Sequence, residues 1–140
     1  MSVSGPIIII EDDVDDQQIL NESLLDLGVK NLVLFFDNCM DVYEYLLETL
    51  DKPFMILSDV NLPVMTGSEL KRRINENESL RKKAIPFIFF TTTANAKAVE
   101  EAYEMMVQGY FEKETSLRSL KITLKTIIDY WKLCKHPNNM

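Results

Sequence analysis

Apolar residues along this chain alternate between short continuous runs and sets with helical spacing. The first run is four isoleucines at 7–10, directly after Pro6. A run of this length without polar alternation predicts a strand that is buried on both faces. The apolar residues that follow recur every three or four positions up to Gly28, which predicts an amphipathic helix that stops there. This helical set consists of Ile19, Leu20, Leu24 and Leu27.

The same alternation continues to the end of the chain. Further strands are predicted at 32–36, 54–57, 87–90 and 110–111, and further helices at 41–50, 70–74, 94–106 and 117–131. Five strands that alternate with five helices over short connections indicate an α/β fold, in which helices cover both faces of a parallel sheet. The crossovers are expected to be right-handed. Residues 136–140 are interpreted as a frayed tail.

Two of the predicted helices divide clearly into an apolar and a polar face. On the helix at 41–50, Val42, Leu46 and Leu50 share the apolar face. On the helix at 70–74, Leu70 and Ile74 are the apolar positions. Its polar face carries a run of three cations, Lys71, Arg72 and Arg73.

Composition limits the possible classes of function. The 140 residues, 46% of them hydrophobic, are enough for one domain spanning 1–140 with a core at about 7–133, and leave no room for an effector domain. A net charge of −7 gives no attraction to nucleic acid or anionic lipid. We find neither a signal peptide nor an apolar run of roughly 20 residues, so we expect a cytoplasmic protein. Cys39 and Cys134 are predicted to be free thiols.

Residues capable of chemistry follow several of the predicted strands. In an open α/β sheet, ligands bind beyond the carboxyl ends of the strands, so these residues are expected to share one edge. Asp37-Asn38, after the second strand, is interpreted only as a helix cap. The other strand ends carry Glu11-Asp12-Asp13, Ser58-Asp59, Thr91-Thr92-Thr93 and Glu112-Lys113.

Carboxylates gathered at one edge would repel one another. A pair about 4 Å apart costs roughly 4 kcal/mol at an effective dielectric near 20, and either a raised pKa or a bound cation relieves it. Ligand sets made only of oxygen select hard ions such as Mg²⁺. A carboxylate at such a site can act as a nucleophile toward phosphorus, while Mg²⁺ and a lysine neutralise the phosphoryl oxygens. Thr91 is placed to donate a hydrogen bond to a phosphoryl oxygen.

Each of these residues also has an ordinary structural interpretation when it is taken alone. Acidic residues at loop starts often only cap helices or contact solvent, and a single exposed lysine is usually solvated. A threonine at a strand end is commonly a strand former or a cap. The functional hypothesis rests on the coincidence of all four features at the ends of different strands.

The segment 57–67, Leu-Ser-Asp-Val-Asn-Leu-Pro-Val-Met-Thr-Gly, resembles the phosphoacceptor loop of two-component response regulator receiver domains, the family that includes the chemotaxis regulator. The resemblance covers roughly 7–133. It implies a doubly wound, flavodoxin-like sheet of five parallel strands in the order 2-1-3-4-5. It also implies that the chain is a phosphoacceptor signalling domain rather than an enzyme, active in phosphorelay signal transduction.

The resemblance further implies a role for each matching residue. Asp59 corresponds to the phosphoacceptor and a metal ligand, with Glu11 and Asp12 as the acidic pair that binds Mg²⁺ and Asp13 peripheral to it. Asn61 would offer its backbone carbonyl to the metal. The remaining correspondences are Thr91 as the switch hydroxyl, Tyr110 as the switch aromatic and Lys113 as the phosphate-binding lysine.

The implied partners are a histidine kinase or a histidine phosphotransfer protein as the phosphoryl donor. An output protein is expected to bind the face formed by the fourth helix, the fifth strand and the fifth helix, through which receivers also form homodimers. Which kinase, which output and how long the phosphoryl group lasts are not contained in the sequence.

Three positions depart from the family pattern. Glu114 replaces the proline that commonly follows the lysine in a cis peptide, and a cis bond at a residue other than proline costs about 2.5–4 kcal/mol. Thr92 stands where a small residue is usual, and Thr66 replaces a frequent Asp. None of the three removes a residue that the chemistry requires.

Two other functions share part of this pattern. A phosphatase with an aspartyl-phosphate intermediate usually has a second Asp two residues after the nucleophile, but here Asn61 occupies that position and cannot transfer a proton. A degenerate receiver that binds partners independently of phosphorylation is disfavoured, because the full set of expected residues is present. No glycine-rich nucleotide-binding motif occurs.

Overall fold

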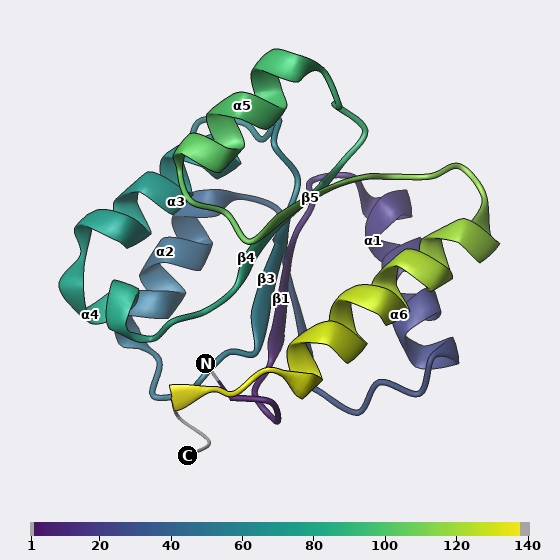
Figure 1. Ribbon diagram of the computed structural model, residues 1–140, viewed down its shortest axis with the longest axis horizontal. Helices are drawn as coiled ribbons and strands as arrows, with labels where there is room; N and C mark the ends of the chain where they lie inside the picture. Colours follow the sequence, from purple (N-terminus) through teal and green to yellow (C-terminus); the bar gives the residue numbers. More distant parts are fainter. Residues whose placement is uncertain (1, 138–140) are drawn as a thin grey trace.

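A five-stranded parallel sheet lies at the centre of the computed structural model, which describes residues 2–137 (Figure 1). The sheet order is β2-β1-β3-β4-β5, and every neighbouring pair is parallel. The doubly wound, flavodoxin-like fold predicted from the sequence is therefore confirmed. The strands are β1 (Ile7–Ile10), β2 (Val33–Phe36), β3 (Met55–Ser58), β4 (Phe87–Thr91) and β5 (Gly109–Glu112).

The described residues contain six helices, one more than the sequence analysis predicted. The additional helix is α4, which begins because the Asn77 side chain accepts a hydrogen bond from the Leu80 N–H while its backbone still caps α3. Leu80 is the one residue that α4 buries, so the sequence contains no apolar periodicity from which this helix could be predicted. The helices are α1 (Val14–Asp26), α2 (Cys39–Glu48), α3 (Gly67–Glu76), α4 (Glu78–Lys82), α5 (Ala96–Glu104) and α6 (Leu117–Leu133).

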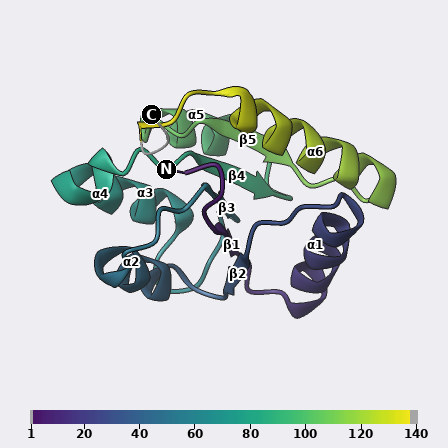
Figure 2. The same cartoon turned by 90° about the horizontal axis from the view of Figure 1, so that it is seen from below.

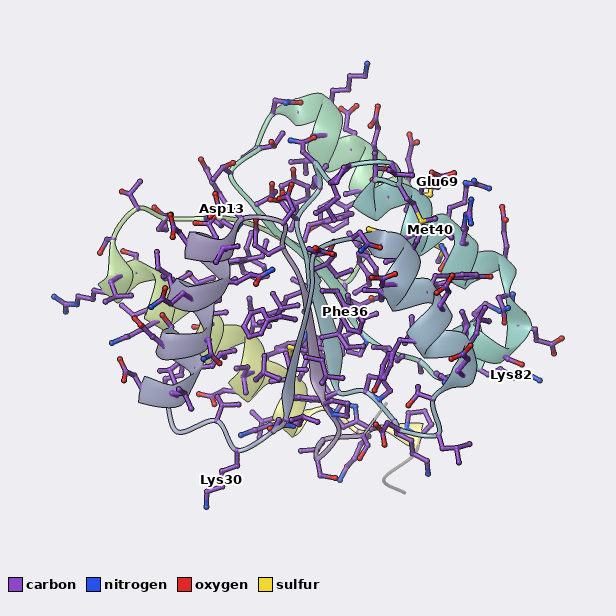
Figure 3. All side chains as sticks on the ribbon, turned by 180° about the vertical axis from the view of Figure 1, so that it is seen from behind. Asp13, Lys30, Phe36, Met40, Glu69 and Lys82 are labelled. Atoms are coloured by element: carbon purple, nitrogen blue, oxygen red, sulfur yellow. The ribbon has the colours of Figure 1, made fainter. Side chains whose placement is uncertain are left out.

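The helices divide between the two faces of the sheet. α1 and α6 cover one face, and α2, α3, α4 and α5 cover the other, as Figures 1 and 2 show from two directions. Side chains fill the space between these layers, with Phe36 on the outer strand β2 (Figure 3). The four isoleucines of β1 are at most 1% exposed, which confirms that this strand is buried on both faces.

Polar side chains fix the start of each helix. Asp13 caps α1 by accepting a hydrogen bond from the Asp16 N–H, and Asn38 caps α2 in the same way, as predicted. Thr66, one of the departures from the family pattern, accepts from the Glu69 N–H and caps α3. At the end of α1, Gly28 has a φ of 73°, the left-handed conformation expected of a terminating glycine.

Three sequence expectations are wrong. Leu50 lies beyond the end of α2 and is 98% exposed, so it has no place on an apolar face. Lys71 was assigned to a polar face but is buried at 7% exposure, because it lies on the side of α3 that faces the molecule. His136 is buried, with Nε2 2.6 Å from the Trp131 carbonyl oxygen and its ring edge-on to Phe54, whereas the predicted tail at 138–140 lies outside the described residues.

Within residues 2–137 no helix has the length and apolar character needed to span a membrane.

Candidate functional site

Three carboxylates meet at the carboxyl ends of β1 and β3. Glu11, Asp12 and Asp59 each offer one oxygen, and these oxygens all lie within 4.8 Å of one another. Glu11 is buried at 2% exposure, Asp12 is exposed and Asp59 lies between these extremes. The expectation that parallel strands bring these residues to one edge therefore holds in the structure. Asp13, predicted to be peripheral, is occupied as the cap of α1.

The Asp59 carboxylate is held from one side by hydrogen bonds. Its Oδ1 accepts from the Val60 N–H at 2.7 Å and from the Thr91 hydroxyl at 2.6 Å, and the Asn61 N–H is 3.4 Å away. Thr91 is the last residue of β4 and is fully buried. These bonds fix the orientation of the carboxylate and leave its other oxygen, Oδ2, turned toward Lys113.

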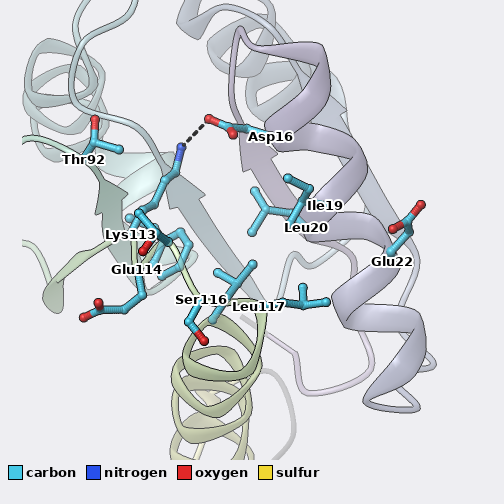
Figure 4. Close-up of a pocket in the computed structure, with 12 residues that line it drawn as sticks. Asp16, Ile19, Leu20, Glu22, Thr92, Lys113, Glu114, Ser116 and Leu117 are labelled. Atoms are coloured by element: carbon cyan, nitrogen blue, oxygen red, sulfur yellow. Dashed lines mark hydrogen bonds and ion pairs between the residues drawn. The ribbon is translucent and has the colours of Figure 1, made fainter.

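Lys113 joins the carboxylates from the loop after β5. Its ammonium group contacts the Glu11 carboxylate directly and lies 3.7 Å from Oδ2 of Asp59. The Asp16 carboxylate, on the first turn of α1, is 3.5 Å away from the same nitrogen (Figure 4). Asp16 was missed by the sequence analysis. Its signal was its position in the first helical turn after β1, at the same edge of the sheet.

Burial and charge act in opposite directions on this ion pair. Burial raises the pKa of Glu11, although the hydrogen bond and charge of Lys113 work against that rise. Burial by itself would lower the pKa of Lys113, but the hydrogen bond to Glu11 and the charges of Glu11, Asp59 and Asp16 outweigh it and raise the pKa. Lys113 is therefore a cation held among carboxylates at neutral pH.

A second set of contacts connects the site to Tyr110. The Asn61 side-chain amide donates to the Thr93 hydroxyl at 2.6 Å, and the Tyr110 hydroxyl donates to the Thr93 carbonyl oxygen. The Tyr110 ring packs against Phe89, with the ring centroids 5.8 Å apart. Burial raises the pKa of Tyr110, and the charges of Asp59 and Glu112 add to the effect. Thr93 thus bridges the loop after β3 and the aromatic ring of Tyr110.

The departures from the family pattern leave this geometry intact. The Lys113–Glu114 peptide is trans. Thr92 is exposed and lines a hollow of about 440 Å³ between α1 and the start of α6, beside Lys113 (Figure 4).

The donor set fits a divalent cation of the hard class. Glu11, Asp12 and Asp59 provide only oxygen, which suits ions such as Mg²⁺ and Mn²⁺. Lys113 is the one ammonium that pairs with Glu11, Asp59 and Asp16, and no ion pair is found for Asp12 among the described residues, so negative charge remains for a cation to neutralise. An ion at this edge would meet ligands that the fold already brings together.

Comparison with known proteins identifies the family of the chain. The profile of the response regulator receiver domain matches residues 7–125, and the chain belongs to that family. Response regulator Rcp1 of Synechocystis is 27% identical over 130 residues, which are 89% of this chain and 87% of that protein. Chemotaxis protein CheY of Pseudomonas aeruginosa is 28% identical over 88% of this chain and 95% of its own length.

A third relative shares a shorter segment. The probable methanogenesis regulatory protein FilR2 of Methanothrix harundinacea is 37% identical over 79 residues, 56% of this chain. The matched segment spans half of the length of that protein.

Solved structures resemble the whole fold. The phosphorylated cyanobacterial phytochrome response regulator RcpA superimposes with a TM-score of 0.84 at 26% identity, over 95% of this chain and 98% of that one. The Mn(2+)-bound form of Rcp1 gives a TM-score of 0.80 at 25% identity, over 95% and 99%. The chain is thus a receiver domain of two-component signalling, a phosphoacceptor module rather than an enzyme with turnover on a free substrate. Receiver domains pair with histidine kinases.

Proposed function

We propose that this chain accepts a phosphoryl group on Asp59 from a histidine kinase or a histidine phosphotransfer protein, and that this event changes which protein it binds. Glu11, Asp12 and Asp59, with the backbone carbonyl of Asn61, would hold Mg²⁺. The bound ion would supply positive charge against the phosphoryl oxygens. Lys113 and Thr91 complete the proposed site.

The proposed reaction is a transfer between two nucleophiles. An oxygen of the Asp59 carboxylate forms a bond to phosphorus, and the bond from phosphorus to the donor nitrogen breaks, with its electron pair returning to the donor histidine. Lys113 stands 3.7 Å from Oδ2 of Asp59, where its charge can meet the oxygens of the arriving group. Thr91 already donates to the other carboxylate oxygen and can donate to a phosphoryl oxygen instead.

One observation carries this proposal. The carboxylates of Glu11 and Asp12, the buried hydroxyl of Thr91 and the ammonium of Lys113 converge on Asp59 from the ends of three other strands. A set that served only to cap helices would not need a buried Glu11 paired with Lys113. The family membership and the Mn(2+)-bound form of Rcp1 support the same interpretation.

The proposed output surface is the face formed by α5, β5 and α6. β5 is the edge strand of the sheet and lies between these two helices (Figure 1). Tyr103 on α5 and Tyr130 on α6 are 52% and 60% exposed, so the flanking helices offer aromatic contacts. Tyr110, on β5, touches the site through Thr93 and would report phosphorylation to this face. A homodimer through the same face is part of the proposal.

Acetyl phosphate with Mg²⁺ tests the site without a kinase. Wild type is expected to gain the mass of one phosphoryl group, and Asp59→Asn to gain none. Asp13→Asn is the matched control, since Asp13 lies beside the cluster but only caps α1. Labelling that persists in Asp59→Asn would overturn the site assignment. Absence of both labelling and Mg²⁺ binding in wild type would favour a module that acts without phosphorylation.

A further inference from the structure

Two residues with an acidic or strongly basic side chain are buried among the described residues. One is Glu11, which belongs to the candidate site and pairs with Lys113. The other is Lys71 on α3, at 7% exposure. Within residues 2–137 the Lys71 ammonium has no carboxylate partner, and it lies over the Phe87 ring, 6.0 Å from the centroid. The stem of Lys71 is buried, but among the described residues its Nζ is not one of the side-chain nitrogens that are shielded from solvent without a partner, so the ammonium reaches the surface at the pocket described next.

Lys71 lines a pocket at the edge of the sheet opposite to Asp59. The pocket has a volume of about 610 Å³ and is lined by residues of α3, of α4 and of the end of α6. It reaches Pro86 and Gln108, which directly precede β4 and β5. Because a strand rises about 3.3 Å per residue, the five residues of β4 separate the two edges by roughly 16 Å. The pocket is therefore distinct from the site of the carboxylates.

The charged side chains that line the pocket are all cationic among the described residues. Arg81 on α4 and Lys135 in the segment after α6 join Lys71 on α3, so two helices and one loop each contribute a cationic side chain. No acidic residue is among the described residues that line the pocket, although the chain as a whole carries a net charge of −7. One guanidinium N–H of Arg81 donates to the Asn75 carbonyl oxygen at 2.9 Å, which leaves the rest of its donors for a ligand. A concentration of unpaired positive charge in an acidic protein points to an anion.

The walls of the pocket suit an organic body attached to that anion. Its volume falls within the range usual for small-molecule sites, roughly 300–1,000 Å³. The amides that line it already bond to backbone groups, Asn75 to the Met105 carbonyl and Gln108 to the Phe87 N–H, so the walls are fixed. Trp131, the single tryptophan of the chain, offers an aromatic surface. The remaining apolar lining consists of Ile74, Leu80, Ala84, Ile85 and Met106 together with the prolines.

We propose that this pocket binds a small organic anion, a phosphate ester or carboxylate on a flat apolar body, with Lys71, Arg81 and Lys135 around the anionic group and Trp131 against the body. Such a ligand would supply the negative charge that Lys71 lacks. Burial lowers the pKa of Lys71, and a bound anion would act against that shift. The site does not depend on the phosphoacceptor chemistry.

Trp131 fluorescence provides the test, with EDTA present to exclude metal at the other edge. The probes are phenyl phosphate, benzoate and phenol, which share a ring and differ in charge. Saturable changes are expected for the anions, with phenol weakest. Tighter binding of phenyl phosphate than of benzoate would identify the phosphate ester as the preferred source of the anion, and the reverse order would identify the carboxylate. Asp59→Asn should bind the probes as wild type does.

Charge variants separate specific binding from a general effect of charge. Lys71→Met keeps the packed stem of the side chain but removes the ammonium. The affinity for whichever anion binds more tightly should fall about tenfold or more. Lys82→Met removes one charge from the same region, but Lys82 points outward from α4 and pairs with Glu78, so binding should stay unchanged (Figure 3). If Lys71→Met does not fold, Arg81→Gln is tested in its place, because Arg81 is exposed and its replacement should not disturb the core.

Three outcomes would overturn the proposal. One is equal binding of the anions and phenol, and another is unchanged affinity in both Lys71→Met and Arg81→Gln. The third is the absence of any saturable change in Trp131 fluorescence together with an unchanged unfolding temperature. The second measurement is needed because a ligand that binds the folded state raises the unfolding temperature.

Discussion

Val64 carries backbone strain that can be measured directly. It lies in the loop between β3 and α3 with a φ of 67°, and its side chain is 98% exposed. The left-handed region costs a residue with a Cβ roughly 1–2 kcal/mol, and a β-branched residue is especially ill suited to it. Glycine removes this cost but adds about 0.5–1 kcal/mol of chain entropy to the unfolded state. Because almost no buried area is lost, Val64→Gly should stabilise the fold by about 0.5–1 kcal/mol.

Urea unfolding and thermal melting measure this change, with an expected rise of about 2–4 °C in the melting temperature. Leu50→Gly is the matched control, because Leu50 is equally exposed but does not have a positive φ. The free energy of unfolding of Leu50→Gly should fall by about 0.5–1 kcal/mol, because the added chain entropy of the unfolded state is the one contribution at this position. A loss in Val64→Gly as large as the loss in Leu50→Gly would refute the reasoning. Labelling by acetyl phosphate should be the same in both variants.

Other predictions concern the core, the thiols and the charge balance of the site. Gly67→Ala places a Cβ 2.5 Å from a Phe89 ring carbon and 2.7 Å from a backbone carbonyl oxygen, so urea unfolding should show a loss of about 1–3 kcal/mol; an unchanged midpoint would contradict the packing. Burial, helped by the charge of a nearby glutamate, raises the pKa of Cys39 to about 12, so its thiolate is scarce at pH 8. Alkylation of the native protein should therefore label Cys134 alone, as measured by peptide mass spectrometry. Labelling of Cys39 in the native protein would contradict this prediction. Lys113→Met removes the cation that the carboxylates share, so calorimetry should show Mg²⁺ binding strengthened by about tenfold, and weaker binding would refute that role.

The site could be predicted from sequence because its residues follow strands. Glu11, Asp59 and Thr91 each stand at the end of a short apolar run, and parallel strands bring such ends together whatever the rest of the fold does. The strand order followed from the resemblance of the loop around Asp59 to a known family. The sheet and the cluster were therefore accessible before any coordinates.

Features that depend on how helices rotate and end were not accessible. Lys71 lies within a run of three cations, and only the packing of α3 against its neighbours buries it while Arg72 stays exposed. α4 is too short to have a period, and His136 is buried by contacts with Trp131 and Phe54 that no local pattern encodes. Each miss comes from a tertiary contact that overrides the local signal.

Lys113 connects the two halves of the proposed chemistry. Its ammonium contacts Glu11 and lies 3.7 Å from Asp59, so it already offsets part of the repulsion that the carboxylates would otherwise exert. Glu11 cannot give the same oxygens fully to Lys113 and to a metal. If Glu11 serves as a metal ligand, as proposed, Lys113 would be free to pair with Asp59 instead. The proposed function therefore requires that Lys113→Met affect two measurements in opposite directions, strengthening Mg²⁺ binding while slowing labelling by acetyl phosphate. If the ion pair were purely structural, Lys113→Met would change the stability of the fold. Mg²⁺ affinity and the labelling rate would then either stay unchanged or change in the same direction.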